Sequence, residues 1–171
     1  DYVSAGGKCL LLSRGSHIEN TNYYYAQTTF YTEFRTIPWN AGPGNSGTVV
    51  ANHPALVAFP HDEMCDVQFV YLIRDVLPME FTPLKQYGVE PIVRGIDWYR
   101  TNRDNAYLLE FNVGQGKVLA TTFNILPRMK DHLEVRDFER RLKDYALGDQ
   151  FHPSAKVPAA DFMSLFSSRP K

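Results

Sequence analysis

Two short stretches of the chain combine aromatic rings with polar side chains. Trp39 lies among proline and glycine residues, and Trp98, Tyr99 and Arg100 follow one another in a second polar turn. Aromatic rings can stack on the apolar faces of sugars, while planar polar side chains bond the sugar hydroxyl groups. Loops also carry binding residues more often than strands do. We therefore predict these four residues as carbohydrate contacts, with packing of the rings against a sheet or a neighbouring domain as the alternative.

Acidic residues form the second group that could do chemistry. A glycosidase needs two carboxyl groups beside the bond that it cleaves, roughly 5–10 Å apart depending on mechanism. Asp62, Glu63 and Asp66 lie near the expected start of a helix, where negative charge also stabilises the helix dipole. Glu110 lies in an expected strand, where we expect partial burial with an ion-pair or hydrogen-bond partner. We favour the structural interpretation of all four and predict no catalytic residue.

The histidines and cysteines do not have the spacing of metal ligands. His53 and His61 lie near acidic residues, but no helical pair with i, i+4 spacing is present. We predict no metal site and no cofactor, and expect His53 to be a turn or cap residue before Pro54. Cys9 and Cys65 are too far apart for a metal knuckle or a redox pair. Two buried free thiols are the favoured interpretation, and one disulfide is the alternative.

The composition is that of an ordinary globular domain. The chain has 171 residues, of which 44% are hydrophobic and 22% charged, and its formal net charge is -1. This length favours a single domain over residues 1–171. A nucleic-acid partner would require a basic stripe, and a membrane span would require about 20 consecutive apolar residues. The sequence has neither feature, so we predict no nucleic-acid partner and no membrane span.

The expected secondary structure mixes helices and strands. Strands are predicted over residues 8–13, 48–50, 91–98, 106–113 and 117–124, with an extended segment over 78–84. Helices are predicted over 62–75, 135–147 and 158–166, with one or two helical turns beginning at Pro54. The glycine-rich turn at residues 114–116 predicts an antiparallel hairpin. These elements predict a layered α/β domain with an antiparallel strand pair near its C-terminus.

The first residues indicate the end of a helix. Gly6 and Gly7 precede an apolar strand, and glycine commonly follows the last turn of a helix. A cap without its helix leads us to expect a domain that is incomplete at its N-terminus and was cut from a longer polypeptide. Residues 14–46 are the least regular region, and their length predicts either a functional loop or a regular element that the pattern does not reveal. The sequence leaves open whether they fold alone or only against the parent protein.

Several segments, taken in order, resemble parts of known enzymes. Gly6-Gly7-Lys8 with the following leucines resembles the helix-to-strand step of domains related to class I glutamine amidotransferases. Residues 47–60, which include His53-Pro54, resemble a segment in the C-terminal regions of bacterial family 2-like glycoside hydrolases. Residues 96–119 resemble the strand pair that closes that region, and residues 151–153 resemble its usual tail.

The resemblance implies a flavodoxin-like, amidotransferase-like accessory domain of a secreted or periplasmic bacterial glycoside hydrolase. An active amidotransferase needs a cysteine on a sharp strand-to-helix turn, with a histidine and a carboxylate behind it. The turn after the first expected strand contains Ser16 and His17 but no cysteine. Adjacent residues rarely have the geometry of a nucleophile and its base. The resemblance therefore implies a domain that is not itself catalytic.

We predict a non-catalytic, structural domain that packs against the remainder of the parent glycoside hydrolase, in carbohydrate metabolism. One alternative is a carbohydrate-binding module, which exposed tryptophan rings would favour. The other is a hydrolase with its own site, which would need Glu110 or Asp97 beside a second carboxylate. The expected partners are the parent enzyme, carbohydrate and a second copy of the chain.

Overall fold

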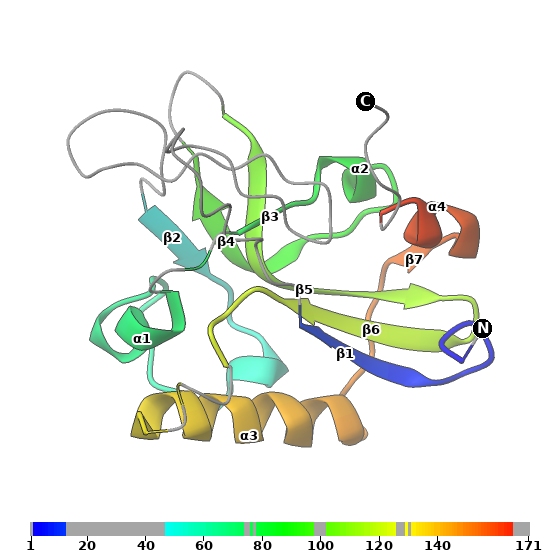
Figure 1. The fold of residues 1–171 in the computed structure, drawn as a ribbon. Helices are drawn as coiled ribbons and strands as arrows, with labels where there is room; N and C mark the ends of the chain where they lie inside the picture. Colours follow the sequence, from blue (N-terminus) through cyan, green and yellow to red (C-terminus); the bar gives the residue numbers. More distant parts are fainter. Residues whose placement is uncertain are drawn as a thin grey trace, which may run out of the picture.

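The computed structural model describes residues 2–12, 47–73, 76, 78–97, 102–125, 129 and 131–165 (Figure 1). The strands are β1 (Lys8–Leu12), β2 (Gly47–Val50), β3 (Met79–Glu80), β4 (Pro91–Ile96), β5 (Asp104–Val113), β6 (Gly116–Thr121) and β7 (Lys156–Val157). The α-helices are α1 (Val70–Ile73), α2 (Thr82–Lys85), α3 (Leu133–Leu147) and α4 (Ala159–Ser164). Two 3₁₀ helices, η1 (Pro54–Leu56) and η2 (Val67–Phe69), precede α1.

The described strands form one seven-stranded mixed sheet. Its main order is β1-β6-β5-β4-β2, and β3 and β7 also pair with the long strand β5. The pairs β1–β6 and β5–β7 are parallel, whereas β5 is antiparallel to β4, β6 and β3. The layered α/β class and the predicted antiparallel hairpin are thus confirmed. The flavodoxin-like detail is not confirmed, because a doubly wound sheet has a parallel centre and the centre of this sheet is antiparallel.

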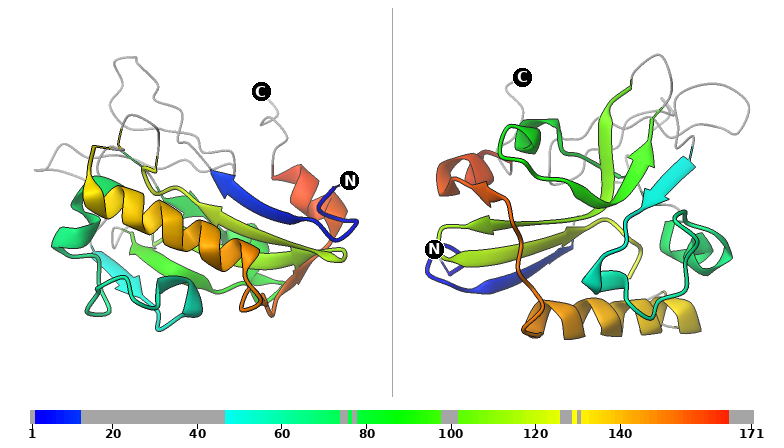
Figure 2. Two further views of the ribbon diagram at one scale, coloured as in Figure 1. Left: turned by 90° about the horizontal axis from the view of Figure 1, so that it is seen from below. Right: turned by 180° about the vertical axis from the view of Figure 1, so that it is seen from behind.

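The two faces of the sheet belong to two hydrophobic cores. Leu108 and Leu119 lie in the core that includes Phe138 of α3. Their strand neighbours alternate to the other side, where Leu109 and Phe111 pack in the core beside α2 and α4. Figures 1 and 2 show α3 along one face of the sheet and α2 and α4 beyond the other. The sheet is therefore the middle layer between helices.

The N-terminal turn has the hydrogen bonds that end a helix. The Gly6 N–H donates to the Val3 carbonyl at 2.9 Å, and the Gly7 N–H donates to the Tyr2 carbonyl at 3.0 Å. With the positive φ of +109° at Gly6, this is the Schellman pattern, as predicted from the glycine pair. The turn packs closely on the β5–β6 hairpin, since a Cβ at Gly116 would lie 1.9 Å from the Val3 oxygen. Only glycine fits there.

The helix predicted over residues 62–75 is wrong in its first half. Helical structure begins at η2, where the Asp66 side chain accepts the Gln68 N–H at 3.4 Å, and ends with α1. Upstream, Glu63 has a φ of +59°, which no right-handed helix accommodates. Its carbonyl instead accepts the Val50 N–H of β2 at 2.8 Å. Pairing with a distant strand therefore overrides the apolar stripe.

The extended segment predicted over residues 78–84 is only partly correct. Two residues form β3, and α2 begins at Thr82. Pro83 lies in the first turn of α2, where its missing N–H leaves no helical hydrogen bond unmade. Proline there indicates a helix start as readily as an extended segment.

The long helix α3 confirms the prediction over residues 135–147 and begins two residues earlier. Val135, Phe138 and Leu142 are buried on its inner side. The N–H of Gly148 donates to the carbonyls of Asp144 and Tyr145, so this glycine caps the helix as predicted, although its φ is -71°. The predicted final helix is also present as α4.

A row of three polar side chains anchors the segment that follows α3. Lys8, Lys117 and Asn112 are register partners on three adjacent strands. Each donates to backbone carbonyls of the segment, which are those of Leu147, Gly148, Phe151, Pro153 and Ala155. The Lys8 ammonium also lies at the C-terminal end of α3, where positive charge is favourable. This row fixes the crossing from the α3 side of the sheet to α4.

Candidate functional site

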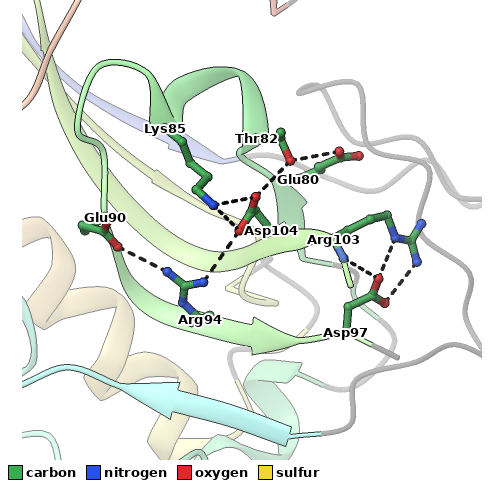
Figure 3. Close-up of polar contacts among 8 residues, drawn as sticks. All are labelled: Glu80, Thr82, Lys85, Glu90, Arg94, Asp97, Arg103 and Asp104. Carbon is green, nitrogen blue, oxygen red and sulfur yellow. Dashed lines mark hydrogen bonds and ion pairs between the residues drawn. The ribbon is translucent and has the colours of Figure 1, made fainter. Parts of the chain in front are cut away.

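The connection between β4 and β5 is closed by a buried ion pair (Figure 3). The Asp97 carboxylate is fully buried, and the Arg103 side chain is 17% exposed. Arg103 donates to it from Nε at 2.9 Å, from Nη2 at 3.2 Å and from its backbone N–H at 2.9 Å. Such a forked pair holds its partners in one geometry. It therefore fixes the two ends of the connection relative to each other.

The local sequence accounts for the position of this pair. Strand β4 ends at Ile96, opposite Asp104, so Asp97 and Arg103 are the first residues beyond the paired strands. Asn102 has a φ of +44°, a left-handed conformation that asparagine tolerates better than most residues. That turn brings the Arg103 backbone and side chain back to Asp97.

The predicted sugar contacts lie outside the described residues. Trp98, Tyr99 and Arg100 belong to the segment between Asp97 and Asn102, and Trp39 precedes β2. Their carbohydrate role stays a prediction. The described flanking residues place only the two ends of the β4–β5 segment, through the buried pair.

A second charged network surrounds Asp104, at the start of β5 (Figure 3). The Asp104 carboxylate accepts from Lys85 Nζ at 2.9 and 3.0 Å, and Arg94 Nη1 lies 3.8 Å away. The Thr82 hydroxyl lies 3.4 Å from Asp104 and 3.1 Å from Glu80. Lys85 and Thr82 belong to α2, so these bonds tie that helix to the sheet. Two cations, Lys85 and Arg94, therefore pair with the Asp104 carboxylate.

A third polar group lies between the sheet and α3. The Tyr145 hydroxyl donates to Glu110 Oε2 at 2.8 Å, and His53 Nε2 lies 3.6 Å from Glu110 Oε1. Burial, and secondarily the bond to the carboxylate, raises the pKa of Tyr145 well above its usual range. The predicted partial burial of Glu110 with a partner is confirmed. Its described partners are a tyrosine and a histidine, whereas the hydrolase alternative would need a second carboxylate.

Two buried polar side chains were not predicted from the sequence. Asn105 is 1% exposed and Thr122 is 2% exposed, and within the described part of the chain neither the Asn105 amide nor the Thr122 hydroxyl has a hydrogen-bond partner. Asn105 lies between Gly95 of β4 and Glu80 of β3. The sequence signal that could have revealed this buried polar group is an asparagine, Asn105, next to a run of apolar strand residues. Unpaired buried polar groups are uncommon in native proteins.

The two cysteines agree with the structural interpretation. Cys9 and Cys65 are free thiols, as favoured from the sequence. Burial raises the pKa of both, that of Cys65 to about 11, which leaves little of the reactive thiolate at neutral pH. Across the described ranges, no three His, Cys, Asp or Glu side chains form a group that could bind a metal ion.

His53 has the predicted role of a cap. Its Nδ1 accepts the Ala55 N–H at 3.2 Å at the start of η1. None of the described helices combines the length and apolar character needed to cross a membrane.

Comparison with known proteins identifies a family. No curated protein matches the chain. The model of a family described as a domain of unknown function, DUF8487, matches residues 1–167. The chain therefore belongs to the DUF8487 family.

Proposed function

We propose that this chain is a non-catalytic accessory domain of a polysaccharide-degrading glycoside hydrolase. The proposal rests on the bonds that three carboxylates of the chain form. Asp97 is bonded to Arg103, Asp104 to Lys85, and Glu110 to Tyr145. Each bond joins two segments of the fold, so these groups act as structural ties.

The setting of the domain is supported by the sequence resemblance. The segments at residues 2–12 and 47–60 support an amidotransferase-like relationship and a place in a secreted or periplasmic bacterial enzyme. In this setting the domain packs against the catalytic part of its parent and shapes access to that part. A second copy of the chain is an additional proposed partner.

Reducing-sugar release from soluble polysaccharides tests this proposal. The native gene product that contains this domain is assayed beside the 171-residue chain, whose folding is checked by circular dichroism. We expect release by the native protein and none by the chain alone. Absence of release from every polysaccharide by the native protein would contradict the glycosidase setting. Release by the chain alone, lost in Glu110→Gln or Asp97→Asn, would support the hydrolase alternative instead.

Carbohydrate binding is the second candidate function. The buried Asp97–Arg103 pair favours it, because the pair anchors both ends of the segment that contains Trp98, Tyr99 and Arg100. A segment held at both ends loses less conformational entropy when it binds a ligand. The aromatic and polar composition of that segment suits a sugar.

Tryptophan fluorescence during titration with soluble polysaccharides tests this candidate. Trp39 and Trp98 are the two tryptophans of the chain, so Trp39→Ala and Trp98→Ala assign the signal. We expect a saturable shift that is lost in one of these variants and weakened in Arg100→Ala. Arg140→Ala, which removes an exposed arginine of α3, is the matched control and should bind normally. A shift that survives both tryptophan variants would contradict binding at these residues.

A further inference from the structure

His53 uses both of its ring nitrogens, and the first of them caps a helix. Its Nδ1 accepts the Ala55 N–H at 3.2 Å. The residue has extended backbone angles, with φ -139° and ψ 142°, and Pro54 follows it as the first residue of η1. This is the geometry of an N-cap, with an imidazole in place of the usual hydroxyl or carboxylate. The bond requires an unprotonated Nδ1.

The second nitrogen faces a carboxylate. His53 Nε2 lies 3.6 Å from Glu110 Oε1, which is too long for a hydrogen bond but close enough for an ion pair. The side chain of His53 is 23% exposed and that of Glu110 is 10% exposed. The other oxygen of Glu110 accepts from Tyr145, whose ring lies edge-on to the imidazole at a centroid distance of 5.6 Å. The carboxylate is therefore held in place beside the imidazole.

These two contacts require different protonation states. A neutral imidazole that accepts at Nδ1 carries its proton on Nε2, whereas a protonated imidazole donates from both nitrogens. Protonation at Nδ1 thus removes the acceptor of the Ala55 N–H. The same proton gives the ring a full positive charge beside Glu110. Histidine is the side chain whose charge ordinarily changes between pH 5 and 8.

We propose that His53 is a proton-controlled helix cap. At neutral to alkaline pH the imidazole caps η1 through Nδ1. At mildly acidic pH it takes up one proton from solvent at Nδ1, releases the Ala55 N–H and forms an ion pair with Glu110. Acid thereby loosens the start of η1 while it ties the imidazole to β5.

The charged groups around the imidazole support this exchange of partners. Glu110 of β5 and Tyr145 of α3 are its titratable contacts among the described residues. Six charged side chains of α3 pair with one another at i, i+3 and i, i+4 spacing, which are Asp137, Glu139, Arg140, Arg141, Lys143 and Asp144. Glu110 is thus the anion that a protonated His53 would meet.

Two-dimensional amide NMR of the whole chain from pH 8 to pH 5 tests the proposal. We expect the Ala55 amide resonance to titrate with the same midpoint as the His53 ring. Its hydrogen-exchange protection should fall about two- to tenfold, the range expected for one lost hydrogen bond. The Leu84 amide of α2, which donates to the Phe81 carbonyl at 2.8 Å, is the internal reference. An Ala55 amide that ignores the titration of His53 would overturn the proposal.

Two variants separate the cap from the ion pair. Asparagine is a good cap that does not titrate, so His53→Asn should keep the Ala55 amide protected at both pH values. Glu110→Gln keeps the titrating cap but removes the anion that favours the protonated imidazole, so the Ala55 amide should stay protected to lower pH than in the parent chain. Equal acid responses of Glu110→Gln and the parent chain would show that the ion pair is not formed. If His53→Asn fails to fold, the Glu110→Gln comparison still decides the matter.

Discussion

Asp97 and Glu110 are two carboxylates of similar burial that the fold compensates in different ways. The Asp97 side chain is 0% exposed and faces the guanidinium of Arg103, which keeps its positive charge at all relevant pH values. The Glu110 side chain is 10% exposed and contacts a hydroxyl and an imidazole. The partner of Asp97 is thus a permanent cation, whereas the charge of the imidazole beside Glu110 depends on its protonation.

The difference follows from where the two groups lie. Asp97 lies at the end of β4, where a long flexible side chain from the same connection can reach it. Glu110 lies in the middle of β5, in the layer covered by α3. Neutral partners there avoid bringing a second charge into an apolar core. Four experiments sharpen this contrast.

Arg103→Met should have the largest effect. It removes the guanidinium from a buried carboxylate, and breaking such a pair typically costs about 3–5 kcal/mol of unfolding free energy. Urea unfolding measures the loss. Arg141→Met is the matched control, because its partner Asp137 is 38% exposed, and it should cost no more than about 1 kcal/mol. Equal losses of unfolding free energy in the two variants would contradict the inference that the buried Asp97–Arg103 pair stabilises the fold more than an exposed pair does.

Glu110→Ala should come next. It leaves the Tyr145 hydroxyl without its acceptor at a buried position, for which about 1–3 kcal/mol is typical. Glu110→Gln retains an acceptor oxygen and should lose less, as measured in the same urea experiment. If the glutamine variant is as unstable as the alanine variant, the charge of Glu110 matters more than its hydrogen bond.

The stability of the chain should fall with pH above about 10 in a manner that depends on Tyr145. Its pKa is raised in the folded protein, so the unfolded chain, whose tyrosines ionise near pH 10, loses this proton first. The contribution is fully present below pH 10 and is lost as pH rises, by up to about 1 kcal/mol at pH 11. Urea unfolding of the parent chain and Tyr145→Phe at pH 9 and pH 11 measures it. A parallel fall in both proteins would argue against this assignment.

Lys85→Met should have the smallest effect. The Lys85 side chain is 49% exposed, and exposed ion pairs typically contribute about 0–1 kcal/mol. Salt screens such pairs, so the loss should shrink further in concentrated sodium chloride. If Lys85→Met lost as much unfolding free energy as Arg103→Met, and salt did not change the loss, the Lys85–Asp104 pair would behave as a buried ion pair and not as an exposed one.

Much of the local structure was predictable because it depends on neighbours in the sequence. Three apolar runs predicted the strands near residues 91, 106 and 117, and the glycines at 114 and 116 predicted the hairpin of the last two. Gly6 and Gly7 predicted the helix-ending turn, and the partial burial of Glu110 followed from its position in a strand. The helix over residues 62–75 failed, because the Glu63 carbonyl pairs with β2 rather than with its own helix.

The sequence by itself determined five of the described strands, the hairpin and the long helix, because propensity and turn chemistry act over a few residues. Only the tertiary structure decided that β1 pairs in parallel with β6, more than 100 residues later in the chain, and that β5 binds strands along both edges. It also decided that Arg103 neutralises Asp97 and that Tyr145 and His53 meet at Glu110. Such contacts form only when the apolar faces of distant segments are buried together, and their register depends on that packing rather than on local pattern.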